Sequence, residues 1–222
     1  MISIVIPTLN EAQALPNTLQ SVFLQSGEFE VIVADGGSDD RTLEVARKHS
    51  QVNIISAPKG RASQMNAGAA VAKGEWLLFL HADALLPENA LLIIQQQQIA
   101  DAGGFRHRFS NGAWSLWLVS WLHNFRCSRT GVFYGDQAMF IRRSLFESMR
   151  GFPDVDHLED LLFGEKLKTQ TNPVFLKQEV ISDSRKFEQQ GVWLSLFRVI
   201  LIQLCHELKL PTPTKKFFAD VR

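Results

Sequence analysis

The chain has 222 residues, enough to bury one substantial hydrophobic core, and open α/β sheets of this size commonly form a single domain. Its 23 Lys and Arg residues equal its 23 Asp and Glu residues, so a formal net charge of zero gives no general attraction to nucleic acid. Cys127 and Cys205 match neither a zinc-binding spacing nor a disulfide framework. We therefore expect no nucleic-acid partner and a cytoplasmic location.

The first half of the sequence alternates apolar runs with helical patterns. The run at 2–6 is rich in β-branched residues and lacks a basic n-region, so it is typical of a buried strand and not of a signal peptide. Further strands are expected at 29–34, 52–56 and 76–80, and helices from 10–11 onward, at 42–49, at 62–72 and from 87 through the glutamine run at 95–98. This alternation predicts a mostly parallel central sheet flanked by helices on both faces.

The pattern changes after the glycines at 103–104. Strands are expected at 105–109, 132–141 and 174–181, and helices at 113–125, 143–149, 159–168 and 192–208. The last of these is an apolar C-terminal helix that ends before Pro211 and Pro213. No internal repeat or long linker interrupts the chain.

Two apolar segments, 114–122 and 192–204, fall short of the roughly 18 uninterrupted apolar residues expected of a membrane span. Arg198 and Gln203 interrupt the second segment. Such segments usually form core or an oligomer interface, and they also leave contact with a membrane surface open.

Two acidic clusters follow different strands of the expected sheet. One contains Asp35, Asp39 and Asp40, and the other places Asp83 just after His81. Ligands of such sheets bind beyond the carboxyl ends of the strands, where both clusters are expected. Adjacent carboxylates repel each other unless a cation or hydrogen-bond donors neutralise them, so a metal ion or a nucleotide base would account for the clusters. The alternative is helix capping, which Asp40 could provide for the helix that follows it.

His81 and Asp83 also allow two interpretations. A functional Asp83 would supply an oxygen ligand to Mg²⁺ or Mn²⁺, and His81 would add a nitrogen ligand that favours Mn²⁺. The alternative is an ordinary turn with a satisfied imidazole.

Glu159 and Asp160 begin a helix in the second half of the chain. Acidic residues favour a helix N-terminus through the helix dipole, which is one explanation. The other makes Asp160 a general base that takes the proton from an attacking hydroxyl. The basic pairs Arg185–Lys186 and Arg126 with Arg129 could neutralise phosphate groups, although surface pairs often have no such role.

With these residues in place, the chain resembles glycosyltransferase family 2, whose members have the GT-A nucleotide-sugar fold. Within the family it is most similar to a bacterial subgroup of radical-SAM/selenodomain-associated transferases. The resemblance runs nearly end to end and is carried by segments in the family's order at 4–11, 33–42, 60–68, 80–83, 134–137, 151–153 and 159–160.

The resemblance implies an inverting enzyme that transfers a sugar from a nucleoside-diphosphate sugar, expected to be a UDP-sugar, to an unidentified acceptor. It places the following residues at the nucleotide: Pro7, Thr8, Asn10, Glu11, Asp35, Arg61 and Asp83. The segment 80–83 takes the place of the metal-binding Asp-X-Asp motif, with His81 in place of the first Asp, so Asp83 and His81 would bind Mn²⁺ or Mg²⁺. Asp160 would be the catalytic base, and the acceptor side would contain Tyr134, Asp136, Gln137, Glu159 and Arg185.

On this interpretation residues 1–222 form one GT-A domain with a nucleotide-binding half at 1–103, an acceptor half at 104–190 and a helical tail at 191–222. If the apolar segments contact a membrane, the protein would lie peripherally on the inner face of the cell membrane and a lipid-linked acceptor would be favoured. Nucleotidyl transfer or nucleotide-sugar hydrolysis remains an alternative, although the segment 7–10 lacks the Gly-rich basic loop of nucleotidyltransferases. A non-catalytic role in binding a membrane or partner is the other alternative.

Overall fold

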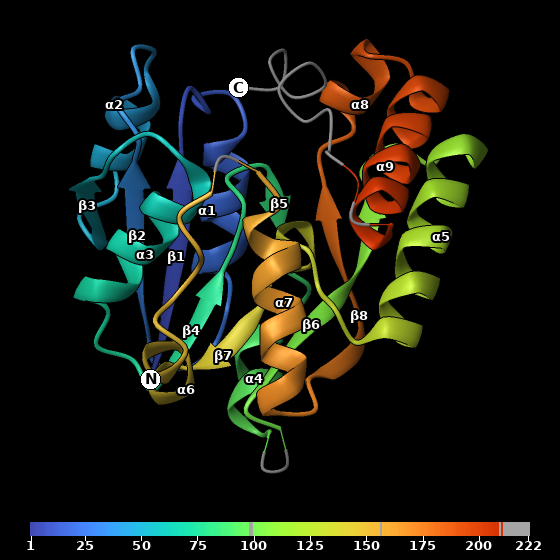
Figure 1. Ribbon diagram of the computed structural model, residues 1–222. Coiled ribbons are helices and arrows are strands. Elements are labelled where there is room, and N and C mark those ends of the chain that lie inside the picture. Colours follow the sequence, from blue (N-terminus) through green and yellow to red (C-terminus); the bar gives the residue numbers. More distant parts are fainter. Residues whose placement is uncertain (98–99, 156, 209, 211–222) are drawn as a thin grey trace.

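The computed structural model describes residues 1–97, 100–155, 157–208 and 210, and its centre is one mixed sheet (Figure 1). In the described chain this sheet has eight strands in the order β3-β2-β1-β4-β7-β6-β8-β5. The strands are β1 (Ile2–Thr8), β2 (Phe29–Asp35), β3 (Val52–Ser56), β4 (Trp76–Phe79), β5 (Ala84–Leu85), β6 (Ala102–Phe109), β7 (Phe140–Arg142) and β8 (Val174–Ser182).

The first four long strands form the parallel part of the sheet. β1 pairs in parallel with β2 and β4, and β2 pairs in parallel with β3. β7 runs antiparallel between β4 and β6, and β6 pairs in parallel with β8. Thr8 lies opposite Asp35 and Val5 opposite Phe79, so the carboxyl ends of β2, β1 and β4 meet at one edge, as the sequence predicted.

Helices cover both faces of the sheet, which confirms the expected α/β class. They are α1 (Leu15–Phe23), α2 (Thr42–Arg47), α3 (Arg61–Val71), α4 (Ala90–Gln95), α5 (Trp114–Thr130), α6 (Arg143–Ser148), α7 (Glu159–Gln170), α8 (Arg185–Gln189) and α9 (Val192–Glu207), with a 3-10 turn, η1 (Gly135–Gln137). Because side chains alternate along a strand, Ile4 packs towards α1, α2 and α4, whereas Val5 packs towards α3, α6 and α7. A Cβ at Gly68 would lie 2.3 Å from Val5 Cγ1, so glycine allows α3 to approach β1 closely.

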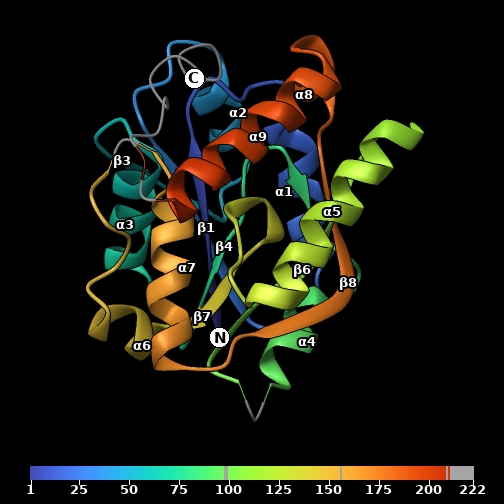
Figure 2. The same ribbon diagram turned by 45° about the vertical axis from the view of Figure 1, so that its right-hand side comes forward.

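A separate layer of helices covers the far end of β6 and β8. Phe109 of β6 packs against Leu116 and Val119 of α5, and Phe187 of α8 and Leu196 of α9 join this cluster. Figures 1 and 2 both show α5 and α9 side by side, and α9 is the apolar C-terminal helix that the sequence predicted. Within the described ranges, none of the helices combines the length and apolarity needed to cross a membrane.

The predicted strand at 132–141 is wrong over most of its length. Only Phe140–Arg142 is a strand, and the preceding residues are irregular except for the 3-10 turn η1. The cause is Gln137, whose side chain accepts a hydrogen bond from Tyr134 N at 3.2 Å and donates one to Phe105 O at 3.3 Å. These bonds stabilise a tight turn in place of an extended segment.

The start predicted for the first helix, at 10–11, is also wrong, because α1 begins at Leu15. Asn10 has a φ of 57°, which is outside the helical region, and Ala12 N donates to the Asp40 carboxylate at 3.1 Å. Interactions with the neighbouring loop therefore hold this segment out of the helix. Residue 98 of the glutamine run and the tail from 211 onward lie outside the described residues.

Candidate active site

A polar cavity of about 500 Å³ lies at the carboxyl ends of β1 and β4, between α3 and α8. Among the residues expected at a nucleotide or metal, those that line it are Pro7, Thr8, Asn10, Glu11, Arg61, His81 and Asp83. Gln64, Lys186, Gln189 and Gln190 also line it. The structure thus brings residues from four separate segments into one site.

Asp35 lies behind this cavity and is not among the residues that line it. Its side chain is buried, and its carboxylate accepts hydrogen bonds from Gly37 N and Ser38 N at 2.9 Å each and from Ser38 Oγ at 2.5 Å. Thr8 Oγ1 donates a longer bond of 3.3 Å. Asp35 therefore orders the loop after β2 in this state, and its contact with a base stays a prediction.

Two further polar residues fix the ends of the strands and loops at this site, Asp40 of the acidic loop and Gln64 of α3. Asp40 accepts hydrogen bonds from Thr42 N at 2.8 Å and from Ala12 N at 3.1 Å and so ties the start of α2 to the loop after β1, but the N-cap residue of α2 is Arg41 and no side chain of the described residues caps this helix. Gln64 of α3 donates to Thr8 O at 2.7 Å and to Ala34 O at 2.9 Å, and it thereby fixes the ends of β1 and β2 against each other. Gln64 was not singled out from the sequence, since a buried glutamine gives no local signal.

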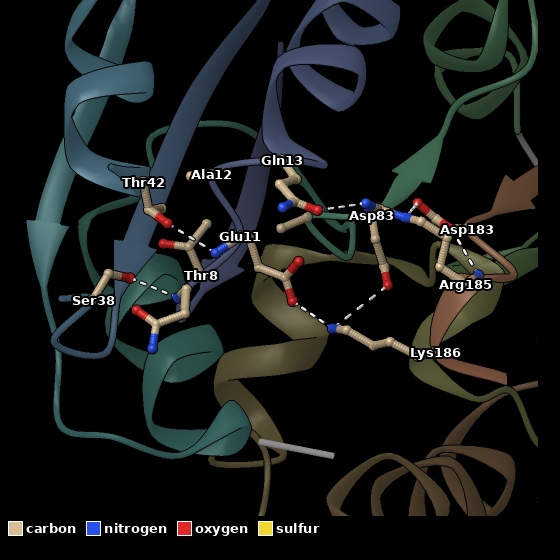
Figure 3. Close-up of polar contacts among 12 residues, drawn as sticks. Thr8, Glu11, Ala12, Gln13, Ser38, Thr42, Asp83, Asp183, Arg185 and Lys186 are labelled. Carbon is tan, nitrogen blue, oxygen red and sulfur yellow. Dashed lines mark hydrogen bonds and ion pairs between the residues drawn. The ribbon is translucent and has the colours of Figure 1, made fainter. Parts of the chain in front are cut away.

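Lys186 is one of three cationic residues of the described chain that line the polar cavity, with Lys59 and Arg61. Its Nζ lies 2.6 Å from Glu11 Oε1 and 3.9 Å from Asp83 Oδ2, between the two carboxylates (Figure 3). Burial raises the pKa of the Glu11 carboxyl, although Lys186 opposes that effect. The neighbouring Arg185 instead points to Asp183 and to Gln13, so it lines neither cavity and does not lie with the other acceptor-side residues.

The donor set suits a divalent metal that arrives together with a diphosphate. Asp83 offers one partly exposed carboxylate, with 23% of its side chain accessible. No group of three His, Cys, Asp or Glu residues in the described chain could hold a metal alone. Mg²⁺ in phosphate-binding sites commonly uses one or two carboxylates and completes its shell with phosphates and water, so Asp83 fits this role. His81 Nε2 is buried, and a Cβ at Gly135 would come within 2.4 Å of it.

A second cavity of about 780 Å³, here called the apolar cavity, adjoins the first through shared Arg61 and His81. It lies between α5, α9, η1 and the start of α7. Its lining includes four of the expected acceptor-side or catalytic residues, Tyr134, Asp136, Glu159 and Asp160. Gln137, by contrast, is fully buried behind it. Asp83 and Asp160 thus face two connected cavities on either side of His81.

Asp160 is held in place by backbone donors. Gly135 N donates to its Oδ2 at 2.9 Å and Leu161 N to its Oδ1 at 2.8 Å. Because His81 packs so closely on Gly135, the position of Asp160 depends on a glycine in η1. Arg61 Nη1 lies 3.6 Å from Glu159 Oε1, which connects α3 of the polar cavity to α7 of the apolar one.

Three histidines surround Asp136 in the apolar cavity. His107 Nε2 lies 3.8 Å from Asp136 Oδ2, and His123 Nε2 lies 3.4 Å from Asp136 Oδ1. Burial lowers the pKa values of His81 and His107 to about 4 each. Burial opposes ionisation of Asp136 too, but His123 and the other nearby cationic groups outweigh it and lower the pKa. His107 and His123 were missed from the sequence, since they come from β6 and α5 without any shared motif.

Comparison with solved structures identifies the class of fold. S. aureus TarS (residues 1–349) superimposes with a TM-score of 0.66 at 19% identity, over 92% of this chain and 65% of TarS. The mannosyltransferase PcManGT from Pyrobaculum calidifontis, in complex with GDP-Man and Mn²⁺, gives a TM-score of 0.67 at 21% identity, over 97% of this chain and 67% of PcManGT. The protein has the GT-A fold of these glycosyltransferases.

Sequence comparison gives the family. The chain belongs to glycosyl transferase family 2, whose model matches residues 3–149. It is 44% identical over 95 residues to a PGL/p-HBAD biosynthesis glycosyltransferase of Mycobacterium tuberculosis, covering 40% of this chain and 37% of that protein. It is 30% identical to an undecaprenyl-phosphate 4-deoxy-4-formamido-L-arabinose transferase of Pseudomonas aeruginosa, covering 67% of this chain and 49% of that protein. The chain therefore spans about a third to a half of the length of these relatives.

Proposed function

We propose that the protein transfers a sugar from a nucleoside-diphosphate sugar, most simply a UDP-sugar, to an acceptor hydroxyl with inversion. The observation that carries this proposal is the meeting of the two cavities at Arg61 and His81, with Asp83 in one and Asp160 in the other. Solved relatives of the same fold were obtained with UDP and with GDP-Man and Mn²⁺, which supports a nucleotide in the polar cavity. We also propose that the protein belongs to the radical-SAM/selenodomain-associated subgroup, because segments 80–83 and 134–137 resemble that subgroup.

In this reaction the acceptor oxygen forms a bond to the anomeric carbon as the bond from that carbon to the diphosphate oxygen breaks. The electron pair leaves with the nucleoside diphosphate, and the acceptor proton passes to the Asp160 carboxylate. A divalent metal at Asp83 would supply positive charge to the departing diphosphate. Lys186, within 4 Å of Asp83, would add further positive charge beside it, and Lys59 and Arg61 also line this cavity. The bonds from Gly135 N and Leu161 N keep Asp160 oriented for proton transfer.

A membrane-surface location is part of the proposal. The helices beside the apolar cavity expose aromatic side chains at Trp114, Trp117, Trp121, Phe125, Trp193 and Phe197. Tryptophan is enriched where proteins meet the membrane–water interface, because its ring is apolar with one polar edge. A relative named for undecaprenyl phosphate is consistent with such a location. Flotation with liposomes tests it directly, and a protein that stays at the bottom of the gradient would contradict it.

Thermal unfolding with nucleoside diphosphates tests the donor site. A ligand that binds only the folded state raises the apparent melting temperature, so UDP with Mn²⁺ should raise it more than UDP alone. Asp83→Asn should remove the metal-dependent part of the shift. Asp39→Asn is the matched control, since Asp39 lies on the adjacent loop and does not line the polar cavity. Absence of a shift with any nucleoside diphosphate would refute a nucleotide-sugar donor.

A further inference from the structure

We infer that the apolar cavity binds an acceptor made of an apolar body and an uncharged head that carries the reacting hydroxyl. This inference rests on the proposed sugar transfer, because it names the acceptor class for the same site. Its basis is a cavity with two chemically different ends.

The outer end of the apolar cavity is hydrophobic and open. Leu122 and Phe125 of α5 face Val199 and Ile200 of α9 across it, and these four side chains are 37%, 52%, 36% and 42% exposed. The volume of about 780 Å³ falls within the range of roughly 300 to 1,000 Å³ that is typical of small-molecule sites. Covering this apolar surface would give an acceptor's body a favourable hydrophobic contribution.

The inner end carries buried polar atoms without hydrogen-bond partners among the described residues. His107 is only 2% exposed, and its Nε2, the Nε2 of His123 and Oδ1 of Asp136 all lack such partners. His107 Nε2 lies 3.8 Å from Asp136 Oδ2, and His123 Nε2 lies 3.4 Å from Asp136 Oδ1. These contacts are too long or too poorly aligned for direct hydrogen bonds. A hydroxyl can donate to the carboxylate and accept from an imidazole N–H at once, so a hydroxyl-bearing head would satisfy these atoms.

The charges favour an uncharged head over a phosphate. The charged lining of the cavity is balanced, because among the described residues it contains three arginines and three carboxylates, so a phosphate would meet no excess of positive charge there: Arg61, Arg126, Arg129, Asp136, Glu159 and Asp160. The guanidinium of Arg126 is partly engaged, because Nη2 donates to Val132 O at 3.0 Å and Cζ lies 3.9 Å over the Tyr134 ring, while its buried Nε has no hydrogen-bond partner among the described residues. A phosphate monoester is also anionic at neutral pH and needs no base, whereas a hydroxyl requires one such as Asp160.

Calorimetric titration of the full chain without donor tests the inference with three probes. Geraniol has an apolar body and a hydroxyl, geranyl phosphate has the same body with a phosphate, and glycerol has hydroxyls without the body. We expect geraniol to bind, geranyl phosphate to bind at least about tenfold more weakly because a lining without excess positive charge does not compensate a phosphate for its lost hydration, and glycerol to give no heat. Failure of geraniol to bind, or equal or tighter binding of geranyl phosphate, would overturn the inference.

Matched variants place the binding within the cavity. Ile200→Trp should fill the outer end and abolish geraniol binding, whereas Leu204→Trp, on the same helix but outside the cavity lining, should leave it unchanged. Asp136→Asn should weaken geraniol about fivefold, the effect of losing a charged hydrogen-bond acceptor. Unchanged binding in Ile200→Trp would refute this location. The shift in melting temperature with UDP and Mn²⁺ is measured in parallel on the same proteins. If that shift is absent while geraniol still binds, the result counts against the proposed sugar transfer and not against the acceptor cavity.

Discussion

The two cavities that meet at His81 are built from different parts of the fold. The polar cavity is formed by loops at the ends of β1 and β4, and backbone pairing fixes these strand ends. The apolar cavity is formed mainly by side chains of α5 and α9, which pack on each other outside the sheet. One site thus combines a part set by strand register with a part set by helix packing. The first should tolerate little change in its geometry, whereas the second can vary with its side chains.

The largest expected effect comes from Asp160, which lines the apolar cavity. Asp160→Asn should lower turnover by about 10²- to 10⁴-fold, because the amide cannot take the acceptor proton. Affinity for UDP should stay within about twofold, since Asp160 does not line the polar cavity. Turnover and calorimetric titration of UDP measure the two effects separately.

Asp154→Asn is the control for this variant, because Asp154 precedes α7 and lines neither cavity. Near-normal turnover of Asp160→Asn would remove Asp160 from the role of base.

The next effect concerns Gly135, which packs against His81, a residue shared by the two cavities. In Gly135→Ala the new Cβ would lie 2.4 Å from His81 Nε2 and 2.9 Å from Cε1, so the buried imidazole or η1 must move. We expect a loss of about 2 to 3 kcal/mol in the free energy of unfolding, typical of overpacking, and a fall in turnover through the displaced Asp160. Denaturant unfolding measures the first quantity. Gly112→Ala is the control, since its Cβ would meet nothing within 4 Å; equal effects of the two variants would contradict the close packing.

The pH dependence of unfolding tests a buried histidine of the apolar cavity. His107 faces Asp136, His123 and His81, and burial lowers its pKa from 6.5 to about 4. Between these values the unfolded chain binds more protons than the folded one, so His107 costs stability as the pH falls through 6.5 towards 4. The cost is about 2 kcal/mol between pH 7 and pH 5.

His107→Phe should therefore flatten the pH dependence of unfolding in this range. Chemical denaturation at pH 7, 6 and 5 measures the slope for both proteins, whatever the stability of the variant at pH 7. An identical slope in the variant and the parent protein would show that His107 does not contribute.

The smallest effect concerns the polar cavity alone. Lys186→Gln should raise the Kd for UDP about tenfold, because a charged group beside Asp83 and Glu11 is lost. Lys177→Gln, an exposed change on β8, should leave the Kd unchanged. An unchanged or lower Kd in Lys186→Gln would remove this lysine from the donor site.

The same contrast explains what the sequence could and could not predict. The parallel strands and the polar residues at their ends are local signals, because an apolar run that gives way to Asp35, or to His81 and Asp83, has a visible pattern. Because parallel sheets bind ligands beyond the carboxyl ends of their strands, these signals predicted a ligand site at the edge of the sheet where the polar cavity lies. The helical layer and the family's segments at 134–137 and 159–160 indicated a second site, without its shape.

The features that were not predicted depend on tertiary contacts. The turn at η1 arises from bonds of the Gln137 side chain to Tyr134 and Phe105, and no periodicity reveals these contacts. His107 and His123 gather around Asp136 from separate elements. Arg185 and Lys186 are adjacent in sequence, yet only the structure separates the lysine that lines the polar cavity from the arginine that contacts Gln13.

Arg61 belongs to the lining of both cavities and lies 3.6 Å from Glu159, at the start of the helix that carries Asp160. A diphosphate that attracts this guanidinium would weaken its interaction with Glu159 and so alter the site where the acceptor is deprotonated. By thermodynamic linkage, each substrate would then change the dissociation constant of the other by the same factor. Through a single side chain, the apolar cavity would thus respond to whether the donor is bound in the polar one.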